Sequence, residues 1–319
     1  MIFSFIAIFH VLQWAFLNFP PFSVFLAIFH VLKCVFLIFR DFQFSLHIPV
    51  LQCAFLIFHV YKLAVIALDI ELADPEENLS RVENLMREIP TSPDVVVLPE
   101  LFTTGFIQDE TLLAQVAERV DGTAMQTLKL LSRQYDTAIC GSMAVEDGGK
   151  LFNRAFFIEP DGKSTFYDKR HLFCLSSEAT MFAQGRRPMP VVTFRGWRIA
   201  LMVCYDLRFP VWSRNGKTPY DMLLIPSNWP NAREYAWTHL LIARAIENQA
   251  VVVGANRSGS DDYGTYDHLT FVYDAMGQPI GHPLDDCPIV LAAPSLENIA
   301  KIRRRLPVAA SADSFTIDF

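Results

Sequence analysis

The stretch Trp197–Trp212 passes abruptly from apolar to polar residues. Residues 199–203 are apolar and partly β-branched, a pattern typical of a buried strand. Cys204 ends this run, and three polar side chains follow it up to Arg208. Ligands of α/β folds bind outside the carboxyl ends of the strands, so a thiol at this point is well placed to act as a nucleophile. The alternative is a core cysteine, because free cysteine is among the most buried residue types.

Residues 1–60 differ in composition from the rest of the chain. Only three of them carry a formal charge, and the remainder are mostly apolar. The sequence also repeats, because FIAIFHVL at residues 5–12 returns as FLAIFHVL at residues 25–32. A period of about twenty residues ordinarily suggests a repeat array. These units lack a polar face and turn residues, so a soluble solenoid is not expected.

Three interpretations of residues 1–60 remain open. A membrane-spanning helix needs about 20 apolar residues, and residues 1–19 and 21–39 nearly supply that length. A secretory signal would need a charged start and a small-residue cleavage site, and the segment has neither. The third interpretation is that the segment is translated tandem-repeat DNA upstream of a later start.

From Tyr61 onward the chain has the composition of one large globular domain, residues 61–319. The predicted strands are 63–68, 95–98, 137–143, 151–158, 164–167, 199–203, 222–226, 250–255, 269–273 and 279–281. The predicted helices are 78–89, 112–120, 124–135 and 234–248. We expect the last two strands to form a hairpin. Strands and helices alternate in the first half, which is typical of a layered α/β sandwich with a mixed sheet.

Composition and missing motifs limit the classes of function that the chain can have. The net charge of −7 gives no indication of nucleic-acid binding. The six cysteines lack the spacing of a disulfide framework or of a thiolate zinc site, and they suit a reducing compartment. No phosphate-binding loop or G-x-S-x-G motif is present. We therefore expect no cofactor and no metal, and a cytoplasmic protein, with attachment to a membrane through residues 1–60 as the alternative.

Three reactive side chains each follow a predicted strand, namely Glu100, Lys169 and Cys204. Taken singly, they have ordinary explanations as a solvated acid, a surface lysine and a core cysteine. Taken together, they are the groups that hydrolysis of an amide through a thioester requires. Thiolate is a strong nucleophile, and a carboxylate must remove its proton. A positive donor must stabilise the carbonyl oxygen. We assign that donor role to Lys169 and the backbone N–H of Tyr205, and the role of base to Glu100.

Four sequence blocks resemble the nitrilase superfamily of carbon–nitrogen hydrolases. They are LPELFTTGF at 98–106, YDKRHLF at 167–173, VCYDLRFPVWSRN at 203–215 and RAIENQA at 244–250. The likeness covers about residues 62–319 and none of residues 1–60. Residues 211–215, 227–230 and the ending around 313–319 are most similar to the ω-amidase, or 2-oxoglutaramate amidase, subgroup.

The resemblance implies a four-layer α-β-β-α sandwich that pairs into a homodimer. It implies Glu100 as the base, Lys169 as the oxyanion stabiliser and Cys204 as the nucleophile. It also implies a second glutamate that steadies the site, and Glu178 matches that position. The ordinary alternative for Glu178 is a solvated loop acid.

The same resemblance suggests substrate contacts. Asn228 and Trp229 match the wall of the pocket, and Arg208 matches an arginine of the subgroup. Arg208 has two open interpretations, pairing with a structural acid or with a substrate carboxylate. The chain departs from many members at Val211, where they carry an acid, and at residues 268–270, where they carry a serine motif. These departures bear on the substrate and leave the three reactive groups untouched.

The resemblance implies a thiol-dependent amidohydrolase that cleaves the ω-amide of a small dicarboxylic acid, such as 2-oxoglutaramate. The alternative within the superfamily is a nitrilase or a carbamoylase. A third class is a membrane scaffold in which the hydrolase part is a passenger.

Overall fold

The computed structural model of the chain describes residues 60–216 and 219–317. We predict apolar repeats for residues 1–60 and leave an anchor or a signal open there. Residues 1–59 lie outside the described ranges. Within the described ranges, no helix has the length and apolar character needed to cross a membrane.

Two mixed sheets form the centre of the fold. The first has the strand order β13-β14-β1-β2-β3-β4-β5, in which β1, β2 and β3 run parallel. Its strands are β1 (Leu63–Ile66), β2 (Val95–Val97), β3 (Ala138–Asp147), β4 (Lys150–Ile158), β5 (Ser164–Asp168), β13 (Gly281–Pro283) and β14 (Ile289–Ala292). The second has the order β12-β9-β8-β7-β6, with β7, β8 and β9 parallel. Its strands are β6 (Val191–Phe194), β7 (Trp197–Leu201), β8 (Met222–Ser227), β9 (Val251–Asn256) and β12 (Phe271–Tyr273).

Helices and short elements complete the described part of the chain. The α-helices are α4 (Pro75–Glu88), α5 (Glu110–Val116), α6 (Thr123–Tyr135), α7 (Glu178–Met181), α8 (Glu234–Asn248) and α9 (Leu296–Arg305). The 3₁₀ helices are η1 (Cys204–Arg208), η2 (Asn231–Arg233) and η3 (Val308–Ser311). A separate two-stranded ribbon joins β10 (Ser260–Asp261) to β11 (Gly264–Thr265).

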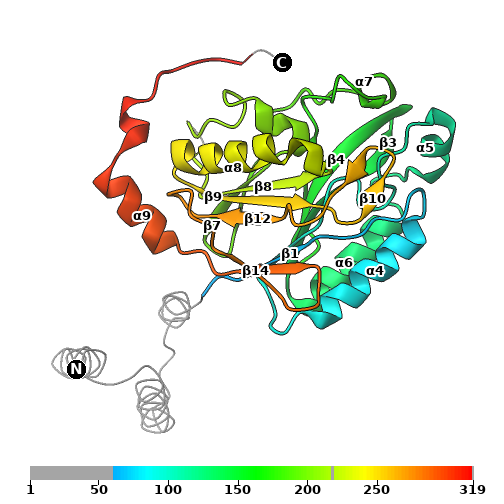
Figure 1. Cartoon of the computed structure of the whole chain (residues 1–319), viewed down its shortest axis with the longest axis horizontal. Helices are drawn as coiled ribbons and strands as arrows, with labels where there is room; N and C mark the ends of the chain where they lie inside the picture. The colour runs from blue at the N-terminus through cyan, green and yellow to red at the C-terminus, as the bar shows by residue number, and fades with distance from the viewer. Residues whose placement is uncertain (1–59, 217–218, 318–319) are drawn as a thin grey trace, which may run out of the picture. The chain divides into compact units, whose positions relative to one another are not determined.

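The sheets lie face to face between two layers of helices. In β1, Leu63 and Val65 belong to the hydrophobic cluster that includes the second sheet. Ala64 and Ile66 point the other way, into the cluster beneath α4 and α6. Figure 1 shows α4 and α6 on one side of the sheets and α8 on the other. This alternation, with a period of two residues, produces the four α-β-β-α layers.

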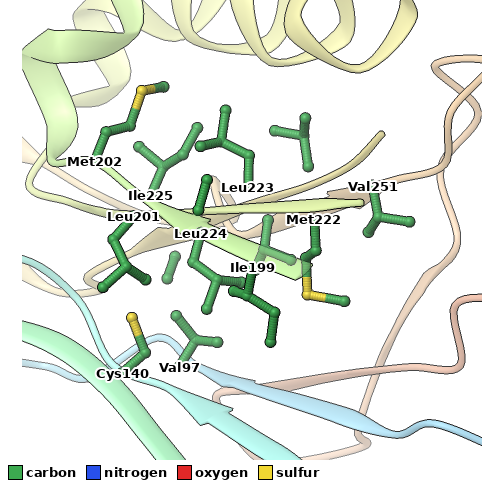
Figure 2. Packing of buried hydrophobic residues seen from close by; sticks show 14 of the residues in the cluster. Val97, Cys140, Ile199, Leu201, Met202, Met222, Leu223, Leu224, Ile225 and Val251 are labelled. Carbon is green, nitrogen blue, oxygen red and sulfur yellow. The ribbon is translucent and has the colours of Figure 1, made fainter. Parts of the chain in front are cut away.

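The core between the sheets is apolar and closely packed. Figure 2 shows Val97 and Cys140 of the first sheet facing Leu201 and Leu224 of the second. Leu223 points to the opposite face of its strand, toward the helical layer. Because residues 199–203 and 222–225 are buried on both faces of the second sheet, their sequences are continuous apolar runs. The predicted α/β class with mixed sheets is therefore confirmed.

The helix predicted over residues 112–120 is shorter than expected. In the structure α5 ends at Val116, and Glu118 makes an isolated bridge with Val145 of β3. The Glu118 carboxylate also accepts the N–H of Ala124, at 2.8 Å, near the start of α6. The spacing of apolar residues cannot predict this end of the helix, because it is set by the contacts of Glu118 with β3 and with the start of α6.

The predicted hairpin of residues 269–273 and 279–281 forms only next to its turn, where the N–H of Ile280 donates to the carbonyl of Val272 at 2.9 Å. Beyond the turn the two segments share one isolated bridge, between Tyr273 and Pro279. The chain then crosses to the first sheet, where β13 pairs with β14.

Candidate active site

Cys204 stands on a sharp turn between a strand and a 3₁₀ helix. Strand β7 ends at Leu201, and η1 begins at Cys204 itself. Cys204 has a φ of 43°, in the left-handed region that residues other than glycine rarely adopt. The buried Asp206 carboxylate accepts the N–H of Val203 at 3.1 Å and so holds the turn. Backbone strain of this kind is common at functional sites.

Glu100 occupies a comparable turn after β2. The next residue, Leu101, has a φ of 47°. Its N–H donates to the hydroxyl of Ser142 at 3.0 Å, and the N–H of Phe102 donates to the carbonyl of the same serine at 3.0 Å. Ser142 lies on β3, so the neighbouring strand fixes the backbone that carries Glu100.

Lys169 follows β5 and is buried with both glutamates. Its ammonium lies 2.7 Å from Glu100 Oε1, 2.8 Å from Glu178 Oε1 and 2.9 Å from Glu178 Oε2. Only 2% of Lys169 is exposed. Burial opposes its charge, but Glu100 and Glu178 outweigh this effect and raise the pKa of Lys169 above its ordinary value. The lysine is therefore charged at neutral pH.

Asn153 is a member of this cluster that our sequence reasoning missed. Its side-chain amide donates to Glu100 Oε1 at 2.8 Å and to Glu178 Oε1 at 3.0 Å. The Ser142 hydroxyl donates to its carbonyl oxygen at 2.9 Å. The signal was present, because Asn153 is an uncharged polar residue within the otherwise mostly apolar run of β4. A buried amide at such a position needs polar partners.

The Cys204 thiol lines the same pocket as the predicted base, Glu100. The backbone N–H of Asn228, another residue of the pocket lining, donates to Glu100 Oε2 at 2.9 Å. Burial raises the pKa of Cys204 well above its ordinary value, Glu100 adds to this, and Lys169 opposes it. The resting group is therefore a thiol, which needs a neighbouring base to become a nucleophile.

A hydrogen-bond network ties the loop after β5 to the Cys204 turn. Asp206 accepts the Tyr167 hydroxyl at 2.7 Å and the His171 N–H at 2.9 Å, and it lies 2.7 Å from His171 Nδ1. The Trp212 indole donates to the Tyr167 hydroxyl at 2.9 Å. Because Lys169 lies between Tyr167 and His171, this network fixes the lysine relative to the thiol.

One pocket contains all the residues that we predict to form the site. Its lining includes the reactive groups and the predicted substrate contacts: Glu100, Lys169, Glu178, Cys204, Tyr205, Arg208, Asn228 and Trp229. Residues that our sequence reasoning did not select also line it: Phe106, Phe173, Pro230, Arg233, Tyr263 and Tyr266. The catalytic candidates are buried, whereas Arg208 and Arg233 are exposed. The pocket therefore has an ionic floor and a cationic rim.

Arg208 forms no ion pair and no side-chain hydrogen bond in the described part of the chain. Its guanidinium carbon lies 4.8 Å from the centroid of the Trp229 ring and 6.0 Å from that of Tyr205. Of its two open interpretations, pairing with a structural acid therefore finds no support among the described residues.

Comparison with known proteins gives a consistent assignment. The carbon–nitrogen hydrolase family model matches residues 62–304. Omega-amidase YafV of Yersinia enterocolitica is 40% identical over 258 residues, 80% of this chain and 98% of that protein. The 2-oxoglutaramate amidase of Bacillus subtilis is 31% identical over 251 residues, 78% of this chain and 96% of that protein.

Solved structures agree with the sequence comparison. A CN-hydrolase superfamily protein of Xanthomonas campestris, with an arsenic adduct in its active site, is 35% identical and superposes with a TM-score of 0.75. The match covers 81% of this chain and 99% of that one. The described fold, the family match and these relatives agree with the resemblance predicted from the sequence motifs. The chain therefore belongs to the carbon–nitrogen hydrolase family of the nitrilase superfamily.

Proposed function

We propose that the protein is an amidase that removes the ω-amide of a small dicarboxylic acid monoamide, such as 2-oxoglutaramate, through a thioester on Cys204. The buried contact of Glu100 and Lys169 beside this thiol carries the proposal. The names of two relatives, an omega-amidase and a 2-oxoglutaramate amidase, support the substrate class.

In the first half of the reaction, Glu100 removes the thiol proton as Cys204 Sγ attacks the amide carbon. The carbonyl oxygen becomes an oxyanion, which Lys169 and the N–H of Tyr205 stabilise. The tetrahedral intermediate then collapses. The C–N bond breaks, Glu100 returns its proton to the leaving nitrogen, and ammonia departs from a thioester.

In the second half, water replaces the thiol as nucleophile. Glu100 removes a proton from the water as its oxygen attacks the thioester carbon. The C–S bond breaks, the sulfur recovers its proton from Glu100, and the carboxylic acid leaves. Glu178 takes no proton in this scheme. Its two contacts with Lys169, together with those of Asn153, hold the ammonium in place.

Arg208 supplies a contact for the far end of the substrate. It is a cation at the pocket rim with no acidic partner in the described residues, and carboxylates bind guanidinium groups through paired, charge-assisted hydrogen bonds. A monoamide of a dicarboxylic acid carries such a carboxylate a few bonds from its amide. This match favours the ω-amidase assignment over hydrolysis of an uncharged amide.

Ammonia release from matched substrates tests the assignment. We expect faster release from 2-oxoglutaramate than from the nitrile or the carbamoyl compound with the same carbon chain. A higher kcat/KM for the nitrile would favour a nitrilase, and a higher value for the carbamoyl compound would favour a carbamoylase.

Deletion of residues 1–60 tests the domain division. We expect the protein starting at Tyr61 to remain folded and to keep kcat/KM within about twofold, because both sheets and the whole pocket lie beyond residue 60. The family resemblance also leads us to expect a dimer, which light scattering on the same sample measures. An insoluble or inactive truncated protein beside an active full chain would make the segment part of the fold.

A further inference from the structure

Aromatic and cationic residues form a continuous ring of contacts around the pocket entrance. Arg208 lies between the rings of Trp229 and Tyr205, and Tyr205 meets Phe173 edge-on with ring centroids 5.2 Å apart. The Arg233 guanidinium carbon lies 4.8 Å from the centroid of Phe173. The Trp229 indole donates to the carbonyl of Arg233 at 2.9 Å, which completes the ring of contacts. We call these five residues the aromatic–arginine rim.

The rim holds its two cations without neutralising them. Several other arginines of the described chain have carboxylate partners, as in Arg154 with Asp168 at 2.5 Å. Among residues 60–216 and 219–317, no acid pairs with the guanidinium of Arg208 or Arg233. An aromatic face attracts a guanidinium and orients it, but carries no compensating charge. The rim therefore presents two full positive charges to an entering molecule.

The floor of the pocket has the opposite character. Glu100 and Glu178 place two carboxylates around one ammonium, that of Lys169. A substrate carboxylate at this depth would be repelled by these two, whereas a neutral amide would not. A substrate with one carboxylate and one amide is thus oriented by charge, with its amide toward the thiol and its carboxylate at the rim.

We infer that Arg233 is a specificity-determining residue that binds the substrate carboxylate together with Arg208. Arg233 ends the short helix η2, and its stacking on Phe173 orients the guanidinium before the substrate arrives. The site then selects anionic monoamides over neutral amides of the same shape. This inference rests on the proposed amidase function and extends it to the choice between charged and uncharged substrates.

The test compares succinamate with its methyl ester, with ammonia release as the readout for both. The two compounds share the amide and the carbon chain and differ in the anionic end. We expect Arg233→Gln to raise KM for succinamate by roughly tenfold or more, as for loss of a hydrogen bond to a charged group. The ratio of kcat/KM for succinamate to that for the ester should fall by a similar factor. Arg133→Gln, an exposed position on α6, is the control and should leave the ratio unchanged.

A second variant separates charge from structure. Arg233→Lys keeps a cation at the rim, so its ratio should lie between those of the native enzyme and Arg233→Gln. An equal loss on both substrates in Arg233→Gln, or a lysine ratio no better than that of glutamine, would overturn the inference. A native enzyme that prefers the ester would instead refute the proposed substrate class, so the two failures are distinguishable.

Discussion

Replacing Cys204 with serine is expected to abolish ammonia release while leaving the fold intact. The hydroxyl is nearly the size of the thiol, but its proton is far harder to remove and the alkoxide is a poorer leaving group from an acyl intermediate. Catalytic groups that act as a unit lose nearly all of their effect when one is removed, so we expect a fall in kcat of at least about 10⁴-fold. Ammonia release and thermal unfolding of the same sample measure the two halves of this prediction.

Cys287→Ser is the matched control, because this half-buried cysteine lies outside the pocket. It should keep its activity. With a slow substrate, the native enzyme should gain the mass of an acyl group on Cys204, and the serine variant should not. A serine variant that retained most of the native kcat would refute the thioester mechanism.

Replacing Lys169 with methionine is expected to lower kcat by about 10²-fold or more, the effect of removing one oxyanion donor. The pH profile should change as well. In the native enzyme the charge of Lys169 lowers the pKa of Cys204, so replacing Lys169 should raise that pKa further. The acidic limb of kcat/KM should therefore move to higher pH.

Lys150→Met, at the exposed start of β4, controls for loss of a lysine elsewhere and should change neither quantity. The rate of acyl-enzyme formation identifies the step that Lys169 serves. If Lys169→Met acylates at the native rate and fails only in hydrolysing the thioester, Lys169 is not the oxyanion donor of the first step. Backbone N–H groups would then fill that role alone.

The sequence allowed prediction of the parts of the site that follow strands. Glu100 and Cys204 stand at changes from apolar to polar residues, and such changes are visible without coordinates. Asn153 was missed because it lies inside a strand, where a period of two residues indicates burial and says nothing about partners. Arg233 was missed because its relation to Phe173 depends on two loops far apart in the chain.

The two places where the fold departs from our predictions have a similar cause. Glu118 has helical neighbours in sequence, yet it serves a strand bridge and the start of the next helix. Residues 281–283 lie just beyond a good turn, yet they pair with β14 in the other sheet. In both cases long-range pairing decides the structure, and local patterns carry no information about the partner.

The three contacts of Lys169 have a consequence for the order of events in catalysis. An ammonium carries three hydrogens, and three carboxylate oxygens surround this one at 2.7 to 2.9 Å. These acceptors are enough to engage all three hydrogens before a substrate arrives. Two of the three oxygens belong to Glu178, whose Oε2 also accepts the N–H of Phe173. In the proposed mechanism the developing oxyanion therefore takes over a contact from one of these carboxylates, which is an exchange of partners at a single nitrogen.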